Sequence, residues 1–330
     1  MKFNSKPLGI YYEHPDWYRP LFNELDRRGV SYDAVQADTH RYDPAETTAP
    51  YAVVFNRMSP SAYTRGRRNL IFYTLQYLAH LERLGVRVIN GQEAWRTEIS
   101  KAYQLGILES LNVSYPRARV IHEPTQAAEA AEGLRFPVVL KPNVGGSGAG
   151  IRRFESATTL ARAAANGELD LGLDGTALVQ EYIPPADGRI IRVEVLNGSY
   201  LYAIRIYTSG DSFNLCPADV CQAVDGAELA RPACPVDAPK NNLRVEAYTP
   251  PGEIIDAVEQ ITAASGIEIG GVEYLVDERD GRACFYDVNA LSNFVADAPR
   301  VLGFDPFARL ADWLESEIAR VTSRAAEVAS

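Results

Sequence analysis

The sequence has no excess of basic residues and no long hydrophobic run, and each absence excludes a class of protein. Its net charge is −10, which argues against a nucleic-acid partner because phosphates require a basic face. No uninterrupted apolar run has the length needed to cross a membrane, and the N-terminus has no apolar core of a signal peptide. We therefore expect a cytoplasmic protein without a membrane partner.

Cysteine is also scarce. The four cysteines, at positions 216, 221, 234 and 284, form no CxxC pair. Structural zinc sites usually show such pairs, so the spacing favours scattered reduced thiols over a thiol-rich zinc site.

The chain's 330 residues exceed what one core usually supports, so several joined units are expected. Residues 1–95 alternate between strand and helix patterns, which predicts an α/β unit with a small parallel sheet. Residues 96–183 form a middle unit around a glycine-rich loop. Residues 184–330 are rich in strands, which predicts an α+β unit, and the stretch 184–188 is the clearest hinge.

The most unusual stretch is "FPVVLKPNVGGSGAGIRRF", residues 136–154, in which a lysine precedes a run of glycines. A P-loop has the reverse order, and no dinucleotide-binding GxGxxG is present either. Backbone N–H groups of small residues can converge on an anion. The loop alone therefore leaves two interpretations open, a phosphate site and a flexible surface hairpin.

The order of three motifs is more specific. "VLKPNVGGSGAGI" is followed by "LVQEYI" and then by "FYDVNALSN", and this order resembles the ATP-grasp superfamily. The chain is most similar to the RimK-like branch that contains glutathione synthetases and ribosomal-protein glutamate ligases. The resemblance covers nearly the whole chain. It implies an ATP-grasp fold preceded by a small parallel-sheet (pre-ATP-grasp) domain.

The resemblance also implies roles for individual residues. Lys101 and Lys141 match the two lysines that bind nucleotide phosphates. The mobile loop over the phosphates corresponds to residues 145–150, and its candidate contacts are Gly145, Gly146, Ser147 and Gly148. The segment that holds adenine corresponds to Gln180, Glu181, Tyr182 and Ile183. At the position of the acid that usually contacts ribose the chain has Ile190, so Asp187 is the nearest replacement.

Three oxygen-bearing residues near the C-terminus match the family's metal ligands, Glu273, Asp287 and Asn289. The resemblance implies Mg²⁺, with two ions expected and Mn²⁺ as an alternative, since hard cations prefer oxygen ligands. Asp287 and Asn289 share one strand face. A three-residue turn at 279–281, with Gly281 left-handed, would place Glu273 opposite Asp287. The alternative is a solvated hairpin face with ordinary acids.

Arginines supply the remaining candidates. A hairpin with a two-residue turn at Asn197-Gly198 would project Arg192 and Arg205 from one sheet face, which is costly unless an anion lies between them. In a ligase reaction we expect Arg205 to stabilise the acyl phosphate and the tetrahedral oxyanion, and Arg192 to hold phosphate or a substrate carboxylate. The alternative is a pair of surface arginines. Arg57 and Asn293 are weaker candidates for substrate contacts.

The predicted activity is that of an ATP-dependent carboxylate–amine ligase that forms an amide or peptide bond through an acyl phosphate. Its expected substrates are a small-molecule acid and an amine, such as an amino acid or a peptide, and a homo-oligomer is compatible with the sequence. Two alternatives remain, a phosphotransferase acting on a hydroxyl and a non-catalytic ATP-binding protein.

Overall fold

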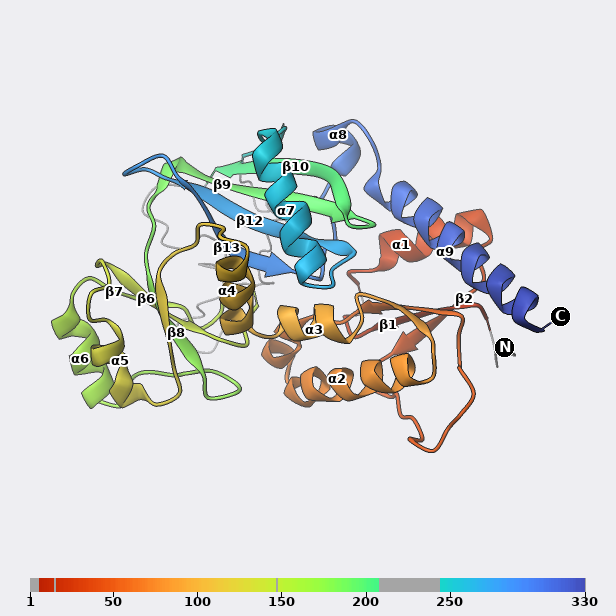
Figure 1. The fold of residues 1–330 in the computed structure, drawn as a ribbon, viewed down its shortest axis with the longest axis horizontal. Helices are drawn as coiled ribbons and strands as arrows, with labels where there is room; N and C mark the ends of the chain where they lie inside the picture. Colours follow the sequence, from red (N-terminus) through yellow and green to blue (C-terminus); the bar gives the residue numbers. More distant parts are fainter. Residues whose placement is uncertain (1–5, 15, 147, 208–243, 330) are drawn as a thin grey trace.

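The computed structural model describes residues 6–14, 16–146, 148–207 and 244–329. Its strands form three sheets along the chain, which Figure 1 shows as three neighbouring groups. No helix within these described ranges combines the length and apolarity needed to cross a membrane.

The N-terminal sheet is parallel, with strand order β2-β1-β3-β4. It confirms the parallel sheet that the alternating pattern predicted, although strand β2 was not foreseen. The strands and the helices between them are β1 (Leu8–Tyr12), α1 (Arg19–Arg28), β2 (Tyr32–Gln36), β3 (Val53–Arg57), η1 (Pro60–Arg65), α2 (Arg68–Arg83) and β4 (Arg87–Ile89). Two short helices then lead to the next sheet, α3 (Gln92–Glu98) and α4 (Lys101–Ser110).

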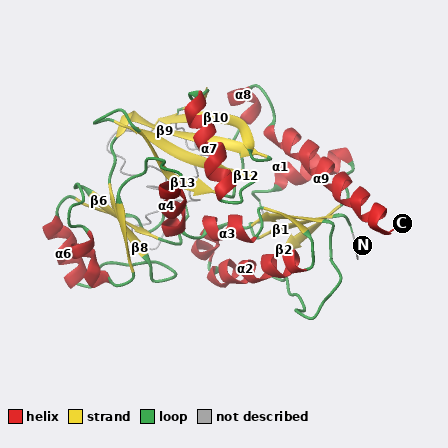
Figure 2. Ribbon diagram, viewed as in Figure 1, coloured by secondary structure: helices red, strands yellow, loops and turns green. Residues whose placement is uncertain are grey.

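The middle sheet is antiparallel, with strand order β5-β8-β6-β7. Its α6 helix lies beside the sheet at one end of the molecule (Figure 2). The elements are β5 (Ala118–Ile121), η2 (Pro124–Gln126), α5 (Ala127–Ala130), β6 (Val138–Pro142), β7 (Arg152–Phe154), α6 (Ala157–Ala165) and β8 (Ala177–Glu181). The glycine-rich loop joins β6 to β7.

The C-terminal sheet is also antiparallel, with strand order β11-β10-β9-β12-β13. Its elements are β9 (Pro185–Leu196), β10 (Ser199–Tyr207), β11 (Val245–Tyr248), α7 (Gly252–Ala264), β12 (Ile269–Asp277), β13 (Ala283–Asn289), α8 (Ala298–Leu302) and α9 (Pro306–Ala329). Helix α7 packs against β9, β10 and β12 on one face of this sheet.

The N-terminal and C-terminal sheets share a hydrophobic core. Leu8, Ile10 and Phe55 from the first sheet belong to the same buried cluster as Ile204 from the last sheet and Trp313 from α9. Helix α9 lies beside α1 (Figure 1), so the end of the chain packs back on its beginning. This shared core holds the N-terminal residues in place at the pocket described next.

Candidate active site

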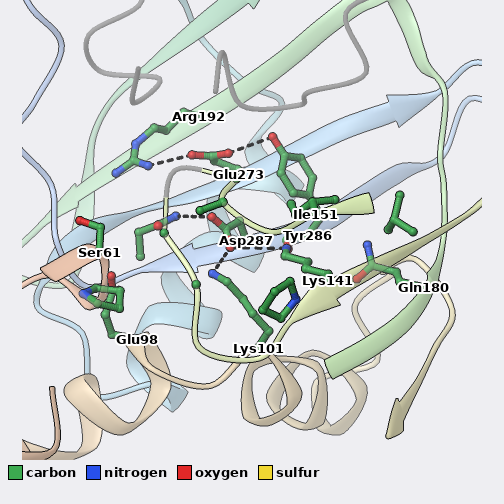
Figure 3. Close-up of a pocket in the computed structure, with 18 of the residues that line it drawn as sticks. Ser61, Glu98, Lys101, Lys141, Ile151, Gln180, Arg192, Glu273, Tyr286 and Asp287 are labelled. Carbon is green, nitrogen blue, oxygen red and sulfur yellow. Dashed lines mark hydrogen bonds and ion pairs between the residues drawn. The ribbon is translucent and has the colours of Figure 1, made fainter. Parts of the chain in front are cut away.

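A pocket lies between the middle and C-terminal sheets, and N-terminal residues line one side of it (Figure 3). Most residues that the sequence proposed for nucleotide, metal, catalytic or substrate contacts line this pocket. They are Lys101, Lys141, Gly145, Gly146, Gly148, Gln180, Glu181, Tyr182, Ile183, Arg192, Glu273, Asp287, Asn289 and Asn293. Ser147 was also predicted, but it lies outside the described residues.

Two lysines converge on one carboxylate. Lys101, the first residue of α4, forms an ion pair with Asp287. Lys141 approaches the same Oδ1 atom, with its Nζ 3.8 Å away, and also donates to the Tyr286 carbonyl at 3.2 Å. Burial alone would raise the pKa of Asp287, but the charges of Lys101 and Lys141 outweigh it and lower that pKa. Asp287 is therefore held as a carboxylate.

Asn143, which follows strand β6, positions the helix that carries Lys101. Its Oδ1 accepts hydrogen bonds from the Ala102 N–H at 2.8 Å and the Ser100 hydroxyl at 3.1 Å. Its carbonyl accepts from the Lys101 N–H at 3.2 Å. The first turn of α4, whose N–H groups lack helical partners, is thus fastened next to the strand that carries Lys141.

The predicted facing of Glu273 and Asp287 is confirmed, since the two residues pair directly across β12 and β13. The predicted three-residue turn is wrong. Val276 is paired with Ala283, so the loop is longer than predicted. Further along, Tyr286 is an extra residue in β13, and this β-bulge restores the register that brings Glu273 opposite Asp287.

The bulge also brings the Tyr286 side chain into the pocket (Figure 3), where its hydroxyl donates to Glu273 Oε2 at 2.9 Å. Gly281 is left-handed, as predicted, with φ of 77°. The length of the β12–β13 hairpin loop and the position of the bulge together therefore decide whether Glu273 and Asp287 lie on the same face of the sheet.

The donor set suits Mg²⁺. Two carboxylates and an amide present oxygens to one pocket, and Mg²⁺ usually takes few protein ligands besides water and phosphate oxygens. Asn289 uses its amide nitrogen to donate to Asp287 Oδ2 at 3.2 Å, which leaves its Oδ1 as the atom able to bind a cation. Among the described residues, no group of three or more histidines, cysteines, aspartates or glutamates is placed to hold a metal ion by itself.

Arg192 lies at the back of this site, buried between two acids. Its Nε donates to Glu194 at 2.6 Å and its Nη1 donates to Glu273 at 2.8 Å. The guanidinium lies over Gly271, where a Cβ atom would come within 2.7 Å of the guanidinium carbon. These contacts give Arg192 a role in holding Glu273, whereas the sequence suggested that it holds phosphate or substrate.

The predicted position of Arg205 is wrong. Leu201 is an extra residue in β10, because Tyr200 pairs with Val195 and Tyr202 pairs with Glu194. Beyond this bulge Arg192 pairs with Ile204, and Arg205 pairs with Ile191. Since paired residues point to one side and neighbours alternate, the two arginines project from opposite faces.

On its own face, Arg205 lies over the ring of Tyr248, with its Cζ 4.0 Å from the ring centroid. It is not among the described residues that line the pocket. The Asn197-Gly198 turn itself was predicted correctly, since both residues have positive φ. Only the bulge, which the sequence did not signal, moved Arg205 away.

The predicted adenine segment, residues 180–183, lines the pocket at the end of β8. The Glu181 side chain is used elsewhere, because its Oε1 accepts from the Arg135 N–H at 2.9 Å. The expected ribose contact of Asp187 is not supported. Its side chain is 72% exposed, pairs with Arg189 and is absent from the described pocket lining.

The glycine-rich loop reaches helix η1 of the N-terminal unit. A Cβ atom on Gly146 would lie 2.8 Å from Ser61 Cβ, so the two chain segments are in close contact. Ser61 and Ser59 both line the pocket, and Arg65 donates to the Ser61 hydroxyl at 3.2 Å. Sequence reasoning missed these serines because no motif marks them.

Arg57 is buried and does not line the pocket, but it orients a residue that does. Its Nη2 donates to Asn293 Oδ1 at 3.0 Å and also to the Ser292 carbonyl. Because a guanidinium can only donate, this contact fixes the Asn293 amide. The Asn293 NH₂ group is thereby left to face other partners in the pocket.

Glu98, at the end of α3, is a further pocket residue that the sequence did not reveal. Burial, partly offset by Lys101, raises the pKa of Glu98 to about 7. Its Oε2 accepts a hydrogen bond from the Ala290 N–H, directly after Asn289. A single acid in a helix carries no sequence signal, so only the tertiary structure shows its place.

Comparison with known proteins agrees with this geometry. Residues 99–216 match a RimK-like ATP-grasp domain. Over 326 residues, the chain is 24% identical to a "Probable alpha-L-glutamate ligase" of Pectobacterium carotovorum subsp. carotovorum (strain PC1), covering 92% of this chain and 97% of that protein.

Solved structures show the same fold. The ATP-grasp ligase PsnB, complexed with a phosphomimetic variant of its minimal precursor, Mg and ADP, has a TM-score of 0.65 at 18% identity, covering 95% of this chain and 100% of that chain. A RimK domain protein ATP-grasp from Sphaerobacter thermophilus DSM 20745 has a TM-score of 0.64 at 19% identity, covering 92% and 98%.

Fold, domain match and relatives agree with the resemblance seen in the sequence: the chain has the fold of ATP-grasp ligases, and residues 99–216 match a RimK-like ATP-grasp domain. The curated relative and the PsnB neighbour are both named as ligases, which is the class of activity that the sequence predicted.

Proposed function

We propose that the pocket binds ATP with its phosphates between two sets of groups. Lys101, Lys141 and the glycine-rich loop contact the phosphates from one side, while Glu273, Asp287 and Asn289 hold two Mg²⁺ ions on the other. The convergence of both lysines on Asp287 supports this arrangement. Residues 180–183 would hold adenine, largely through backbone atoms. In this scheme residues 1–95, 96–183 and 184–330 are the three units that close around the nucleotide.

The reaction would proceed in two steps. A substrate carboxylate oxygen attacks the γ-phosphorus, the bond from that phosphorus to ADP breaks, and an acyl phosphate forms. The lone pair of an amine nitrogen then attacks the acyl carbon. Inorganic phosphate leaves and the nitrogen gives up one proton, which completes the amide.

The protein contributes mainly position and charge to these steps. Glu273, Asp287 and Asn289 would hold Mg²⁺, which would supply positive charge to neutralise the charge that develops on the phosphates. Lys101 and Lys141 stabilise the transferred phosphoryl group. Arg192 holds Glu273 in place through its buried guanidinium, and it partly offsets the burial that raises the pKa of that carboxyl. No side-chain nucleophile is required.

The acid substrate would lie beside the N-terminal wall of the pocket. There the Asn293 amide, oriented by Arg57, offers an N–H donor to a carboxylate or carbonyl oxygen. The serine hydroxyls at 59 and 61 offer further polar contacts. These groups suit a small acid, and the relatives suggest an amino acid or peptide as the amine.

The test is ADP release from purified protein screened with amino acids and dicarboxylates as acids, with and without amines. A ligase requires both substrates, and hydroxylamine converts its acyl phosphate to a hydroxamate. The Asn289→Ala variant serves as the inactive control. Release of ADP with a hydroxyl compound to give a stable phosphate ester, and no hydroxamate, would establish the phosphotransferase instead. Nucleotide binding without turnover on any pair would favour the non-catalytic alternative.

A further inference from the structure

The strand that carries Asp287 and Asn289 has an unusual outer edge. In the part of the chain that the structure describes, β13 is the last strand of its sheet. Edge strands leave backbone N–H and C=O groups without strand partners, and buried groups of this kind must be paired. In β13 the Phe285 N–H donates to the Ser114 carbonyl at 2.9 Å, and towards the end of the strand side chains from other elements make these bonds.

Gln104, on helix α4, pairs with Val288 as a neighbouring strand residue would. Its Nε2 donates to the Val288 carbonyl at 2.8 Å, and its Oε1 accepts from the Val288 N–H at 3.2 Å. The Gln104 side chain is buried, and Nε2 also donates to the Thr97 carbonyl at 2.9 Å. One carboxamide thus satisfies both peptide groups of a residue that lies between Asp287 and Asn289.

Two further side chains bind Ala290, on the other side of Asn289. Glu98 accepts from its N–H, and Asn90 Nδ2 donates to its carbonyl at 2.5 Å. The same Asn90 also bonds to strand β12, donating to the Ile269 carbonyl at 2.6 Å and accepting from the Glu268 N–H at 2.9 Å. Asn90 therefore ties the ends of β12 and β13 together.

These contacts come from one continuous segment, which runs from Asn90 directly after β4 to Gln104 within α4. Asn90 is left-handed, with φ of 51°, a conformation that asparagine tolerates well. Gln104 follows Lys101 by one helical turn, so both residues share a face of α4. One helix therefore presents a phosphate-binding candidate to Asp287 and a backbone clamp to Val288.

We infer that Asn90, Glu98 and Gln104 act as a substitute strand that positions Asp287 and Asn289 for metal binding. This inference rests on the proposed function, because it assigns these residues to the metal site of the ligase. They are positioning residues: their bonds fix the backbone on either side of Asn289, and strand geometry then aims both side chains into the pocket.

The test is Mn²⁺ binding in the presence of ADP, measured by electron paramagnetic resonance, which needs no turnover. In Gln104→Met a side chain of similar size and no charge removes both bonds to Val288. Loss of groups that orient metal ligands typically weakens metal affinity about 10- to 100-fold, and we expect a loss in this range. The affinity for ADP measured without metal should stay close to that of the unchanged protein.

The matched control is Thr262→Val on α7, which also removes a buried hydrogen bond, to the Val258 carbonyl at 3.0 Å. It should lower the melting temperature without changing Mn²⁺ affinity. Unchanged Mn²⁺ affinity in folded Gln104→Met would overturn the inference, as would an equal loss in both variants. If Gln104→Met does not fold, Asn90→Leu decides by the same criteria, since it removes the side-chain bonds to Ala290 and Ile269 without adding a charge.

Failure of the inference and failure of the proposed function give different results. Absence of Mn²⁺ binding and ADP release in the unchanged protein would refute the proposed function. Normal Mn²⁺ binding both in the unchanged protein and in Gln104→Met would refute only the inference that Asn90, Glu98 and Gln104 act as a substitute strand.

Discussion

Lys101 forms a partly buried ion pair with Asp287, although the two lie 186 positions apart in the sequence. Burial acts to lower the pKa of Lys101, but the charges of Asp287 and Glu98 outweigh it and raise that pKa. The lysine is therefore held charged at the floor of the pocket. This ion pair joins a lysine proposed to bind phosphate to a carboxylate proposed to bind the metal.

Replacing Lys141 or Asn289 with alanine should abolish turnover while leaving the fold intact. Each change removes one group aimed at the phosphates or the metal, and loss of one such group commonly costs about 10²- to 10³-fold in rate. ADP release measures the effect, and circular dichroism checks the fold. Lys6→Ala, a change at an exposed lysine, is the control. Either variant working at the normal rate would refute the site assignment.

Arg192 and Arg205 should respond differently to substitution by methionine. Arg192→Met leaves Glu194 and Glu273 buried without their cation, which should cost about 3–5 kcal/mol of unfolding free energy. Arg205→Met removes a half-buried contact with Tyr248 and should cost about 1 kcal/mol, with turnover nearly unchanged. Urea denaturation and ADP release measure both. Loss of turnover in a well-folded Arg205→Met protein would contradict the assignment of Arg205 to the opposite face.

Gly146→Ala should weaken ATP binding because its new methyl group collides with Ser61. Overpacking commonly costs about 1–3 kcal/mol, so KM for ATP should rise about tenfold or more. Adding Ser61→Gly should restore part of the loss, since the Ser61 N–H lies 3.1 Å from the same point and stays in place. Gly252→Ala, where a methyl group meets nothing within 4 Å, is the control. An unchanged KM in Gly146→Ala would show that the loop does not approach Ser61 when ATP binds.

Glu317 should make the packing of α9 sensitive to acid. Hydrogen bonds from Arg320, and next from Arg87, lower the pKa of Glu317 from 4.5 to about 2. A carboxyl with a lowered pKa stabilises the fold above its unfolded pKa, and this stabilisation is lost as pH falls from about 4.5 towards 2.

Glu317→Gln should therefore cost about 1 kcal/mol at pH 7 and almost nothing near pH 2. Thermal unfolding across this pH range measures the difference between the two proteins. A constant difference at every pH would show that the ionised carboxylate is not the cause.

Much of the local structure follows from short-range signals. Asn197-Gly198 forms the expected hairpin turn, and Gly281 has the expected left-handed conformation. The glycine-rich stretch and the acid–x–Asn pair were found because each motif is contiguous. The serines at 59 and 61, Glu98 and Gln104 have no such pattern, and they reach the site only through the packing of the N-terminal segments.

The two β-bulges, at Leu201 and Tyr286, could not be predicted from the local sequence. The bulge at Leu201 places Arg205 on the sheet face opposite to the predicted one. The bulge at Tyr286 compensates for a turn that is longer than predicted, so that Glu273 still pairs with Asp287. One extra residue reverses every side chain beyond it. Bulges depend on packing against the rest of the sheet, so the hairpin sequence alone does not reveal them.

The sequence by itself determined the chemical groups of this protein: the order of lysine, glycines, acids and asparagine, and the turns that local backbone preferences require. The tertiary structure decided which of these groups share a pocket and which lie behind the sheet. The physical reason is that side-chain direction in a strand depends on register, and register is settled by long-range pairing and packing.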